Sequence, residues 1–264
     1  TNAELDHLEE EGADRRAIMR SLSLAVTGPQ TVVTTERDAL AVWDLQQRCS
    51  ALDAPLVTTD RRASLGRDGL PLVPGAYPEN VALVLATTRA CGIHDELALA
   101  GMRRSSHEPQ ENEVLAGAIA GITVNYCNLG SINDADNVIP AIERMMGARR
   151  PGVPRIAVLS GRSDRPLRAL LFAGLLSPTM FDGVAISGGP ETMVRNELIA
   201  SGWSPSHIAR FGWRAYFARG VSNRLERLIR MIDRDARECE LVALENVHVP
   251  VARSLHRLFE VGGR

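Results

Sequence analysis

The sequence predicts an α/β protein whose second half forms an open, doubly wound sheet of mainly parallel strands. The first observation is that short apolar runs and amphipathic stretches alternate over about 150 residues. The second is that a polar turn follows most of the apolar runs. Such alternation is typical of sheets in which helices connect parallel strands. Ligands bind beyond the carboxyl ends of the strands in these sheets, so we expect the functional site there.

The first half of the chain predicts a smaller βαβ unit. A helix is expected over residues 9–26, followed by a β-branched strand at 31–35, a helix at 37–50 and a strand at 56–59. A strand, a helix and a strand at this spacing indicate a parallel pair of strands.

A polar stretch marks the expected boundary between the two halves. Residues 61–78 are rich in Gly, Pro, Arg and Asp and predict an irregular loop, after which two further helices follow. Residues 103–112 are polar, contain a proline and form the candidate linker. We therefore divide the chain into two domains, 1–105 and 106–264.

The second domain is expected to repeat a strand–helix unit. Its predicted elements, in order, are strand 118–124, helix 135–146, strand 155–159, helix 166–175, strand 183–186, helix 191–201, strand 208–211, helix 223–233, strand 241–244 and helix 249–259. The polar residues expected at the carboxyl ends of the strands are Asn125, 160–164, 187–189 and 245–248.

The composition is that of a soluble globular protein. Of 264 residues, 45% are hydrophobic and 23% are charged. The net charge of −2 gives no indication of a nucleic-acid partner, and none is expected. Apolar runs such as 81–86 are far too short to span a bilayer. The four cysteines are widely spaced without a C-x-x-C pair and predict ordinary cytosolic thiols.

The chain contains no lysine, which excludes two kinds of chemistry within it. A P-loop needs a lysine to reach the terminal phosphates of a nucleotide, and a Schiff-base enzyme needs one as its nucleophile. The sequence also lacks a G-x-G-x-x-G after a strand, a G-x-S-x-G elbow and an H-E-x-x-H helix. A dinucleotide dehydrogenase is therefore disfavoured.

Several polar residues have both a functional and a structural interpretation. His7 beside Asp6 is suited to a divalent metal, or to capping a helix. Asn133 and Asp134 precede a predicted helix, where an N-cap role is favoured over a ligand contact.

Further candidates follow the later strands. Arg162 and Asp164 are predicted either to form a surface ion pair or to contact phosphate and ribose, and neither interpretation is favoured. Residues 187–190 (SGGP) suit a tight turn better than an anion-binding nest. His248, which follows the last predicted strand, likewise has both a structural and a functional interpretation.

Taken together and in order, five segments resemble the CapB/PgsB ligases of poly-gamma-glutamate synthesis, which belong to the Mur ligase superfamily. The segments and the family phrases that they resemble are residues 2–9 (N-x-x-x-D-H-x-D, with Glu9 in the last position), 77–93 (the Pro-Asp-Asn-Ala helix ending in Leu-Gly-Ile), 124–135 (V-N-G-F-A-A-N-D-A), 161–165 (C-R-A-D-R) and 245–248 (G-N-I-H-G). The resemblance covers nearly the whole chain. It implies that 1–105 is the back part of a Mur-type central ATPase domain and that 106–264 is a Rossmann-like C-terminal ligase domain.

The resemblance also implies roles for individual residues. It places His7 at a magnesium site and Asn80 against the adenine of ATP. It assigns Asn133 and Asp134 to contacts with the nucleotide, because the matching aspartate of the family binds the ribose of ATP. The implied catalytic residues are Arg162, Asp164 and His248.

The implied activity is ATP-dependent amide ligation on glutamate or poly-gamma-glutamate, with ATP and magnesium as cofactors. The family's P-loop region is expected from an upstream segment, so we expect this chain alone to be inactive. Expected partners are that segment, membrane subunits of a polymer synthase and further copies of the chain, in the cytoplasm or peripherally at the inner face of the membrane. Two alternatives remain: a non-catalytic binding or regulatory subunit that keeps the ligase fold, and an unrelated α/β transferase.

Overall fold

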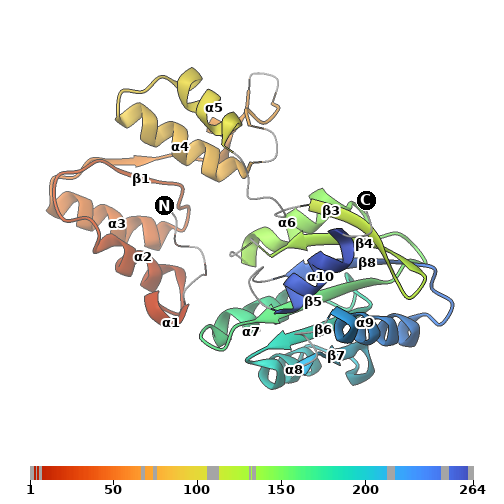
Figure 1. Cartoon of the computed structure of the whole chain (residues 1–264). Coiled ribbons are helices and arrows are strands. Elements are labelled where there is room, and N and C mark those ends of the chain that lie inside the picture. Colours follow the sequence, from red (N-terminus) through yellow and green to blue (C-terminus); the bar gives the residue numbers. More distant parts are fainter. Residues whose placement is uncertain are drawn as a thin grey trace. The chain divides into compact units, whose positions relative to one another are not determined.

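The computed structural model describes most of the chain, and its elements are shown in Figure 1. The described residues are 3, 5, 8–66, 69–73, 76–105, 113–130, 132, 135–212, 218–244 and 250–260. The chain divides into two compact units, Thr1–Pro109 and Gln110–Arg264. Each unit has a sheet of its own, with two strands in the first unit and six in the second.

The first unit is a small α/β unit around a pair of parallel strands. Its elements are α1 (Leu8–Glu11), α2 (Arg15–Ser23), β1 (Val32–Thr34), α3 (Ala39–Ala51), β2 (Leu56–Thr58), the 3-10 helix η1 (Arg61–Ser64), α4 (Pro78–Ala90) and α5 (Asp95–Arg104). Strands β1 and β2 pair in parallel with Val32 opposite Leu56, which confirms the predicted βαβ unit. Aspartates begin two of the helices: Asp14 accepts from the N–H of Ala17, and Asp38 accepts from that of Ala41.

Two apolar clusters hold the first unit together. The larger one joins α2 and α3, and Val32 of β1 and Leu56 of β2 pack against it as partly buried residues. Its buried members are Ala3, Ile18, Met19, Val26, Ala41, Leu45, Cys49 and Ala54. The smaller one packs α4 against the preceding loop through Val73, Val81 and Leu85, with α5 contributing partly buried residues. Burial of these side chains is the main stabilising contribution in a unit whose described sheet consists of two short strands.

The second unit is a three-layer α/β/α structure around one six-stranded sheet. Its elements are β3 (Glu113–Ile119), β4 (Ile122–Leu129), α6 (Ala135–Met146), β5 (Arg155–Gly161), α7 (Pro166–Leu175), β6 (Gly183–Gly188), α8 (Glu191–Ala200), the 3-10 helix η2 (Pro205–His207), β7 (Ile208–Arg210), α9 (Ala218–Ile232), β8 (Glu238–Leu244) and α10 (Pro250–Glu260). The strand order is β3-β4-β8-β5-β6-β7, and all neighbours except β3 and β4 are parallel. This sheet confirms the predicted doubly wound α/β class.

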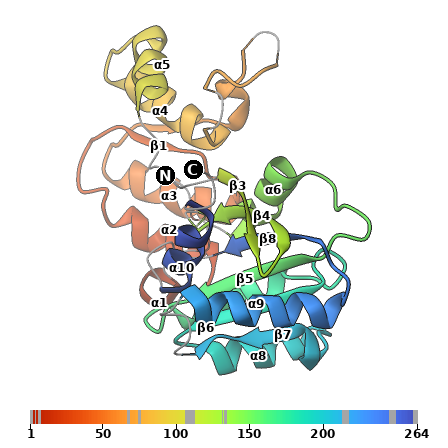
Figure 2. The ribbon, with the colours of Figure 1, turned by 45° about the vertical axis from the view of Figure 1, so that its right-hand side comes forward.

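Helices cover both faces of the sheet. Helices α6, α7 and α8 pack against β4, β5 and β6, respectively, whereas α9 and α10 pack against each other and against β6, β7 and β3. Figure 2 shows α9 and α10 together in front of the sheet. Alternate residues of β5, such as Ile156 and Val158, belong to the core on the α9–α10 side. Both faces are therefore buried, as parallel sheets require.

The prediction of a single strand over residues 118–124 is wrong. The structure has a hairpin there, in which β3 and β4 pair in antiparallel fashion around a turn at Ala120 and Gly121. Both turn residues adopt positive φ angles, 49° and 80°, as in the two-residue turns that suit twisted hairpins. The apolar sequence runs through this turn without a polar break, so the pattern of hydrophobicity concealed it.

The strand that continues after the turn is also longer than predicted. It reaches Leu129, so Asn125 lies in mid-strand rather than at the carboxyl end of the strand where the sequence placed it. The Nδ2 of Asn125 donates to Glu238 Oε1 at 3.0 Å, beside the start of β8. Asn125 is therefore directed to the opposite edge of the sheet from the expected site. None of the described helices has the length and apolar character needed to cross a bilayer.

Candidate functional site

The carboxyl ends of β5 and β6 meet side by side, and the loops that follow them cross in close contact. Gly161 lies opposite Gly188 in the register of the two strands. Gly188 has a φ of +96°, and a Cβ built on it would lie 1.7 Å from the carbonyl oxygen of Gly161. A Cβ on Gly189 would lie 2.4 Å from the Cβ of Ser163. Only glycine fits at these two positions because the neighbouring loop occupies the space of a side chain.

This loop crossing also distinguishes between the two interpretations of residues 187–190. The neighbouring loop fills the space beside Gly188 and Gly189, which favours a tight turn over an anion-binding nest. Beneath the crossing, the buried hydroxyls of Ser160 and Ser187 form a hydrogen bond of 3.3 Å. The two loops are thus held in one arrangement, and the residues on them have fixed positions.

Arg162 and Asp164 lie on the loop after β5 and bind each other. The Nε of Arg162 donates to Asp164 Oδ1 at 2.8 Å, and its Nη2 donates to Oδ2. This hydrogen-bonded guanidinium lowers the pKa of the Asp164 carboxyl below its usual value. The two side chains remain 39% and 58% exposed, so the pair faces solvent at the carboxyl edge. The interpretation of the two residues as an ion pair is confirmed, and their contact with a ligand stays a prediction.

The buried carboxylate of Glu191 connects two elements further along the same edge of the sheet. Glu191 is the first residue of α8, and its Oε1 accepts from the N–H of Gly212 at 2.8 Å. Its Oε2 accepts from Arg210 Nε at 3.2 Å. Glu191 therefore joins the start of α8 to the end of β7. No pattern in the sequence distinguished Glu191, because a glutamate at the start of a helix is an ordinary feature.

In the first unit, the described candidate is Asn80. It lies in the first turn of α4, which begins at Pro78, and its side chain is exposed. At the carboxyl end of β1, the buried Glu36 accepts hydrogen bonds from three backbone N–H groups, those of Ala3, Arg37 and Asp38. Glu36 thus links the backbone of Ala3 to the residues that follow β1. No pattern in the sequence distinguished Glu36 from the other acidic residues.

The remaining predicted site residues lie outside the described residues: His7, Asn133, Asp134 and His248. Of the seven candidates, the structure therefore describes three and brings Arg162 and Asp164 together. Within the described part of the chain, no three His, Cys, Asp or Glu side chains are grouped as metal ligands. Magnesium binding at His7 stays a prediction.

The amino edge of the same sheet carries a dense network of ion pairs that the sequence did not predict. Arg155 and Glu240 are 5% and 3% exposed, and the Nε of Arg155 donates to Glu240 Oε2 at 2.6 Å. Arg150 binds both Glu240 and Glu238 at 2.8 Å. The partners are about 90 residues apart in sequence, so no local pattern could have found them.

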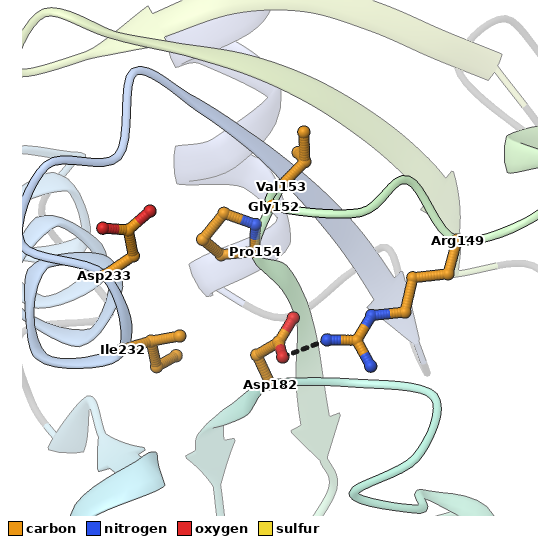
Figure 3. Close-up of a pocket in the computed structure, with 7 residues that line it drawn as sticks. All are labelled: Arg149, Gly152, Val153, Pro154, Asp182, Ile232 and Asp233. Carbon is orange, nitrogen blue, oxygen red and sulfur yellow. Dashed lines mark hydrogen bonds and ion pairs between the residues drawn. The ribbon is translucent and has the colours of Figure 1, made fainter.

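A small pocket lies at this amino edge and is shown in Figure 3. Its volume is about 140 Å³, and it is lined by Arg149, Gly152, Val153, Pro154, Asp182, Ile232 and Asp233. Arg149 and Asp182 form an ion pair across it, and Asp182 also accepts from the N–H of Arg155 at 2.9 Å. The pocket is smaller than the roughly 300 Å³ of typical small-molecule sites, so it does not suit a nucleotide.

Comparison with known proteins identifies the family. Residues 117–261, more than half of the chain, match the family model of the poly-gamma-glutamate synthase CapB C-terminal domain. No curated protein sequence matches the chain.

Solved structures of folylpolyglutamate synthases share the fold. Escherichia coli FolC in complex with ADP matches with a TM-score of 0.62 at 16% identity, over 100% of this chain and 62% of that one. The Mycobacterium tuberculosis folylpolyglutamate synthase with ADP and AMPPCP gives 0.61 at 16% identity, over 98% and 62%. The bifunctional Yersinia pestis enzyme, with AMPPNP and a manganese ion, gives 0.60 at 18% identity, over 97% and 60%.

These likenesses are of fold alone, and the chain spans about three fifths of the length of these structures. They confirm a Mur-ligase type of fold across nearly the whole chain, in agreement with the prediction from the sequence. Because the family model covers most of the second unit, including the loop crossing, the chain belongs to the family of the poly-gamma-glutamate synthase CapB C-terminal domain.

Proposed function

We propose that this chain is part of an ATP-dependent ligase that joins glutamate residues through amide bonds, as in poly-gamma-glutamate synthesis. The main support is the family match over residues 117–261. That segment includes the carboxyl edge of the sheet and its exposed Arg162–Asp164 pair. Relatives of the same fold were crystallised with ADP, AMPPCP or AMPPNP, and one with manganese. We propose that this chain also contributes to binding of a nucleotide and a divalent metal ion.

The proposed reaction has two steps. A glutamate carboxylate oxygen attacks the terminal phosphorus of ATP, the bond from that phosphorus to the bridging oxygen breaks, and ADP leaves. The amine of the next glutamate then attacks the acyl carbon of the resulting acyl phosphate. The C–O bond to phosphate breaks, the amine loses a proton, and an amide and inorganic phosphate are formed. Water must be kept away because it would hydrolyse the acyl phosphate.

The residues of this chain contribute charge and orientation to that reaction. Arg162 is assigned to donate hydrogen bonds to phosphate oxygens as negative charge develops on them. Asp164 is assigned to hold the guanidinium in place through the two hydrogen bonds that join them. His248 completes the proposed catalytic set, and its placement lies outside the described residues. The fixed loop crossing supports this arrangement because it leaves the Arg162 loop little freedom.

The nucleotide and metal contacts are proposed from the family resemblance. Asn80 is assigned to the adenine, Asn133 and Asp134 to the nucleotide near its ribose, and His7 to magnesium. The described residues offer no group of three His, Cys, Asp or Glu side chains for magnesium, so its further ligands would come from elsewhere. Since the chain contains no lysine, the P-loop lysine must come from a segment outside it.

The wider setting is proposed in the same way. Residues 1–105 would be the back part of the central ATPase domain, and 106–264 the domain that receives the incoming amino acid. Glutamate or poly-gamma-glutamate would be the substrate, and membrane subunits of a polymer synthase would be the neighbours. The assembly would be a homo-oligomer, in the cytoplasm or peripherally at the inner face of the membrane. The alternative is a binding subunit without catalysis, which is favoured by the absence of lysine.

Calorimetry of ATP and magnesium binding tests the proposal. The chain is titrated alone and together with the segment encoded immediately upstream. We expect binding with the upstream segment present, weakened about tenfold in Arg162→Ala and Asp134→Ala. Arg195→Ala, which removes a guanidinium from α8 at a residue with no assigned role, is the matched control and should leave binding unchanged. Absence of binding in both samples would contradict the ligase proposal and favour the non-catalytic subunit.

A further inference from the structure

One face of α9 and the turn after it carries an unusual concentration of arginine. Residues 218–237 contain six arginines and only three acidic residues, Glu226, Asp233 and Asp235. The arginines are Arg219, Arg224, Arg227, Arg230, Arg234 and Arg237. We call this set the arginine face. Its positive excess is opposite in sign to the net charge of −2 of the whole chain.

The arginines of this face are mostly without protein partners. Arg230 donates to the carbonyl oxygens of Arg234 and Ala236, and so helps to close the end of the helix. Among the described residues, the side chains of the other five make no hydrogen bond or ion pair. By contrast, Arg150, Arg155 and Arg210 each bind a carboxylate. The free guanidinium groups are therefore available to an external anion.

The fold fixes the direction in which these side chains point. The apolar side of α9 is fully buried in the core between the helix and the sheet, through Val221, Leu225, Leu228 and Ile229. On a helix with a turn of about 100° per residue, Arg219, Arg227 and Arg230 lie on the opposite side, and Arg224 lies at the border. Arg219 and Arg227 are exposed, and Arg224 and Arg230 are half-buried. Rotation of the helix would bury charge, so the arginine face stays toward solvent.

The helix links the two edges of the sheet. It follows β7 at the carboxyl edge and leads into β8, which starts at the amino edge, as Figure 2 shows. Its 15 residues span roughly 22 Å at 1.5 Å per residue. Arg219 lies at the end nearest the carboxyl edge, and Arg234 follows the other end. The charges thus form an extended track that begins at the edge proposed for catalysis.

We propose that the arginine face binds a linear polycarboxylate, namely the growing glutamate polymer, and guides it away from the reaction site. This inference rests on the proposed function. Guanidinium groups bind carboxylates in bidentate fashion, and several weak contacts along one polymer add to useful affinity. A single glutamate reaches one or two of these groups, whereas a polymer reaches several of them at once.

The observations favour a polycarboxylate over other anionic partners. The apolar side of α9 is buried in the core, and Met231 is its one well-exposed large apolar residue in the described part of the helix, so no apolar stripe is left to enter a lipid surface. Residues 218–237 contain no aromatic side chain on which nucleic-acid bases could stack. A flexible chain of carboxylates needs neither feature.

The test measures binding of labelled poly-gamma-glutamate of defined length to the full chain by fluorescence anisotropy. The test variant is the triple substitution Arg219→Gln, Arg227→Gln and Arg234→Gln. The control removes the same charge elsewhere, through Arg61→Gln, Arg62→Gln and Arg195→Gln. We expect the test variant to weaken binding about tenfold or more and the control about twofold or less. Binding should also weaken steeply with added salt and be far weaker for monomeric glutamate.

Several results would overturn the inference. One is equal loss of binding in the test and control variants, and another is no binding of the polymer by the unmodified chain. Tighter binding of an RNA oligomer or of phosphatidylserine vesicles than of the polymer would assign the face to a different partner. Circular dichroism of each variant establishes that it is folded.

Failure of the polymer-binding inference can be distinguished from failure of the proposed ligase function. Nucleotide binding, measured by calorimetry with the upstream segment, should be the same in the test variant and the unmodified chain. Loss of polymer binding alone therefore concerns the arginine face. Polymer binding without any nucleotide binding would retain the arginine face as a polycarboxylate-binding surface and contradict the ligase.

Discussion

The two edges of the sheet in the second unit use charged side chains in opposite ways. At the amino edge, Arg155 and Glu240 are buried against each other, and Arg150 adds a second guanidinium to the same carboxylate. At the carboxyl edge, Arg162 and Asp164 are paired but largely exposed. The buried pair of the amino edge is shielded from solvent, whereas Arg162 and Asp164 at the carboxyl edge remain accessible. This difference predicts that removing one partner costs more stability in the buried pair than in the exposed pair, and that the exposed pair is available for ligands.

The largest expected change in the free energy of unfolding is at the amino edge. Glu240→Ala should destabilise the fold by about 3–5 kcal/mol, because it leaves the buried guanidinium of Arg155 without a counter-charge. Urea denaturation measures the change. Glu238→Ala is the matched control: Glu238 binds the same Arg150 but is 37% exposed, so the expected cost is about 1 kcal/mol or less. Equal costs for the two variants would contradict the comparison between the edges.

The next effect is at the loop crossing of the carboxyl edge. Gly188→Ala should cost about 2–4 kcal/mol, through its positive φ and the contact with the Gly161 carbonyl oxygen. The control is Gly174→Ala in α7, where no atom lies within 4 Å of the added Cβ. That change should stabilise the helix by roughly 0.5–1 kcal/mol. If both variants are neutral in thermal unfolding, the crossing is looser than the structure shows.

A smaller change in the free energy of unfolding, stabilising rather than destabilising, is expected at the centre of the sheet, between the two edges. Tyr126 is fully buried on β4, where it stacks on Phe259 with ring centroids 4.8 Å apart. Its hydroxyl has no hydrogen-bond partner in the described part of the chain, and burial raises its pKa. Tyr126→Phe should therefore leave stability unchanged or raise it by about 1 kcal/mol. A clear loss in denaturant unfolding would reveal a partner for the hydroxyl, such as a bound water.

The smallest effect on stability is expected for the Arg162–Asp164 pair. Arg162→Ala should hardly change the unfolding midpoint, because both side chains are exposed. It should instead raise the pKa of Asp164 back toward its usual value, which NMR titration of the carboxyl carbon measures.

The sign of the pH dependence follows from that lowered pKa. The pair contributes above the usual pKa of an aspartate and is lost as the pH falls through the lowered value, below about pH 4. An unshifted Asp164 in the unmodified protein would contradict the pairing.

Much of the fold could be predicted from local patterns. The helices at 135–146 and 166–175 begin and end where the sequence placed them, because a polar turn and a proline mark their starts. The hairpin of β3 and β4 was missed because Ala120 and Gly121 interrupt an apolar run without any polar signal. At the candidate site, the ion pair of Arg162 and Asp164 was one of two interpretations offered by the sequence, and the geometry of one loop decided that the pair forms. The roles of these residues toward a ligand stay a prediction.

The sequence by itself determined the alternation of strands and helices, the exclusion of a P-loop within this chain by the absence of lysine, and the family resemblance. These properties depend on residue type and on spacing along the chain, which the sequence states directly. Only the tertiary structure decided that β8 lies between β4 and β5, that the loops after β5 and β6 cross at glycines, and that Glu240 meets Arg155. The reason is physical: these contacts join residues far apart in sequence, and they form only when packing of the whole sheet offsets the entropy of bringing such residues together.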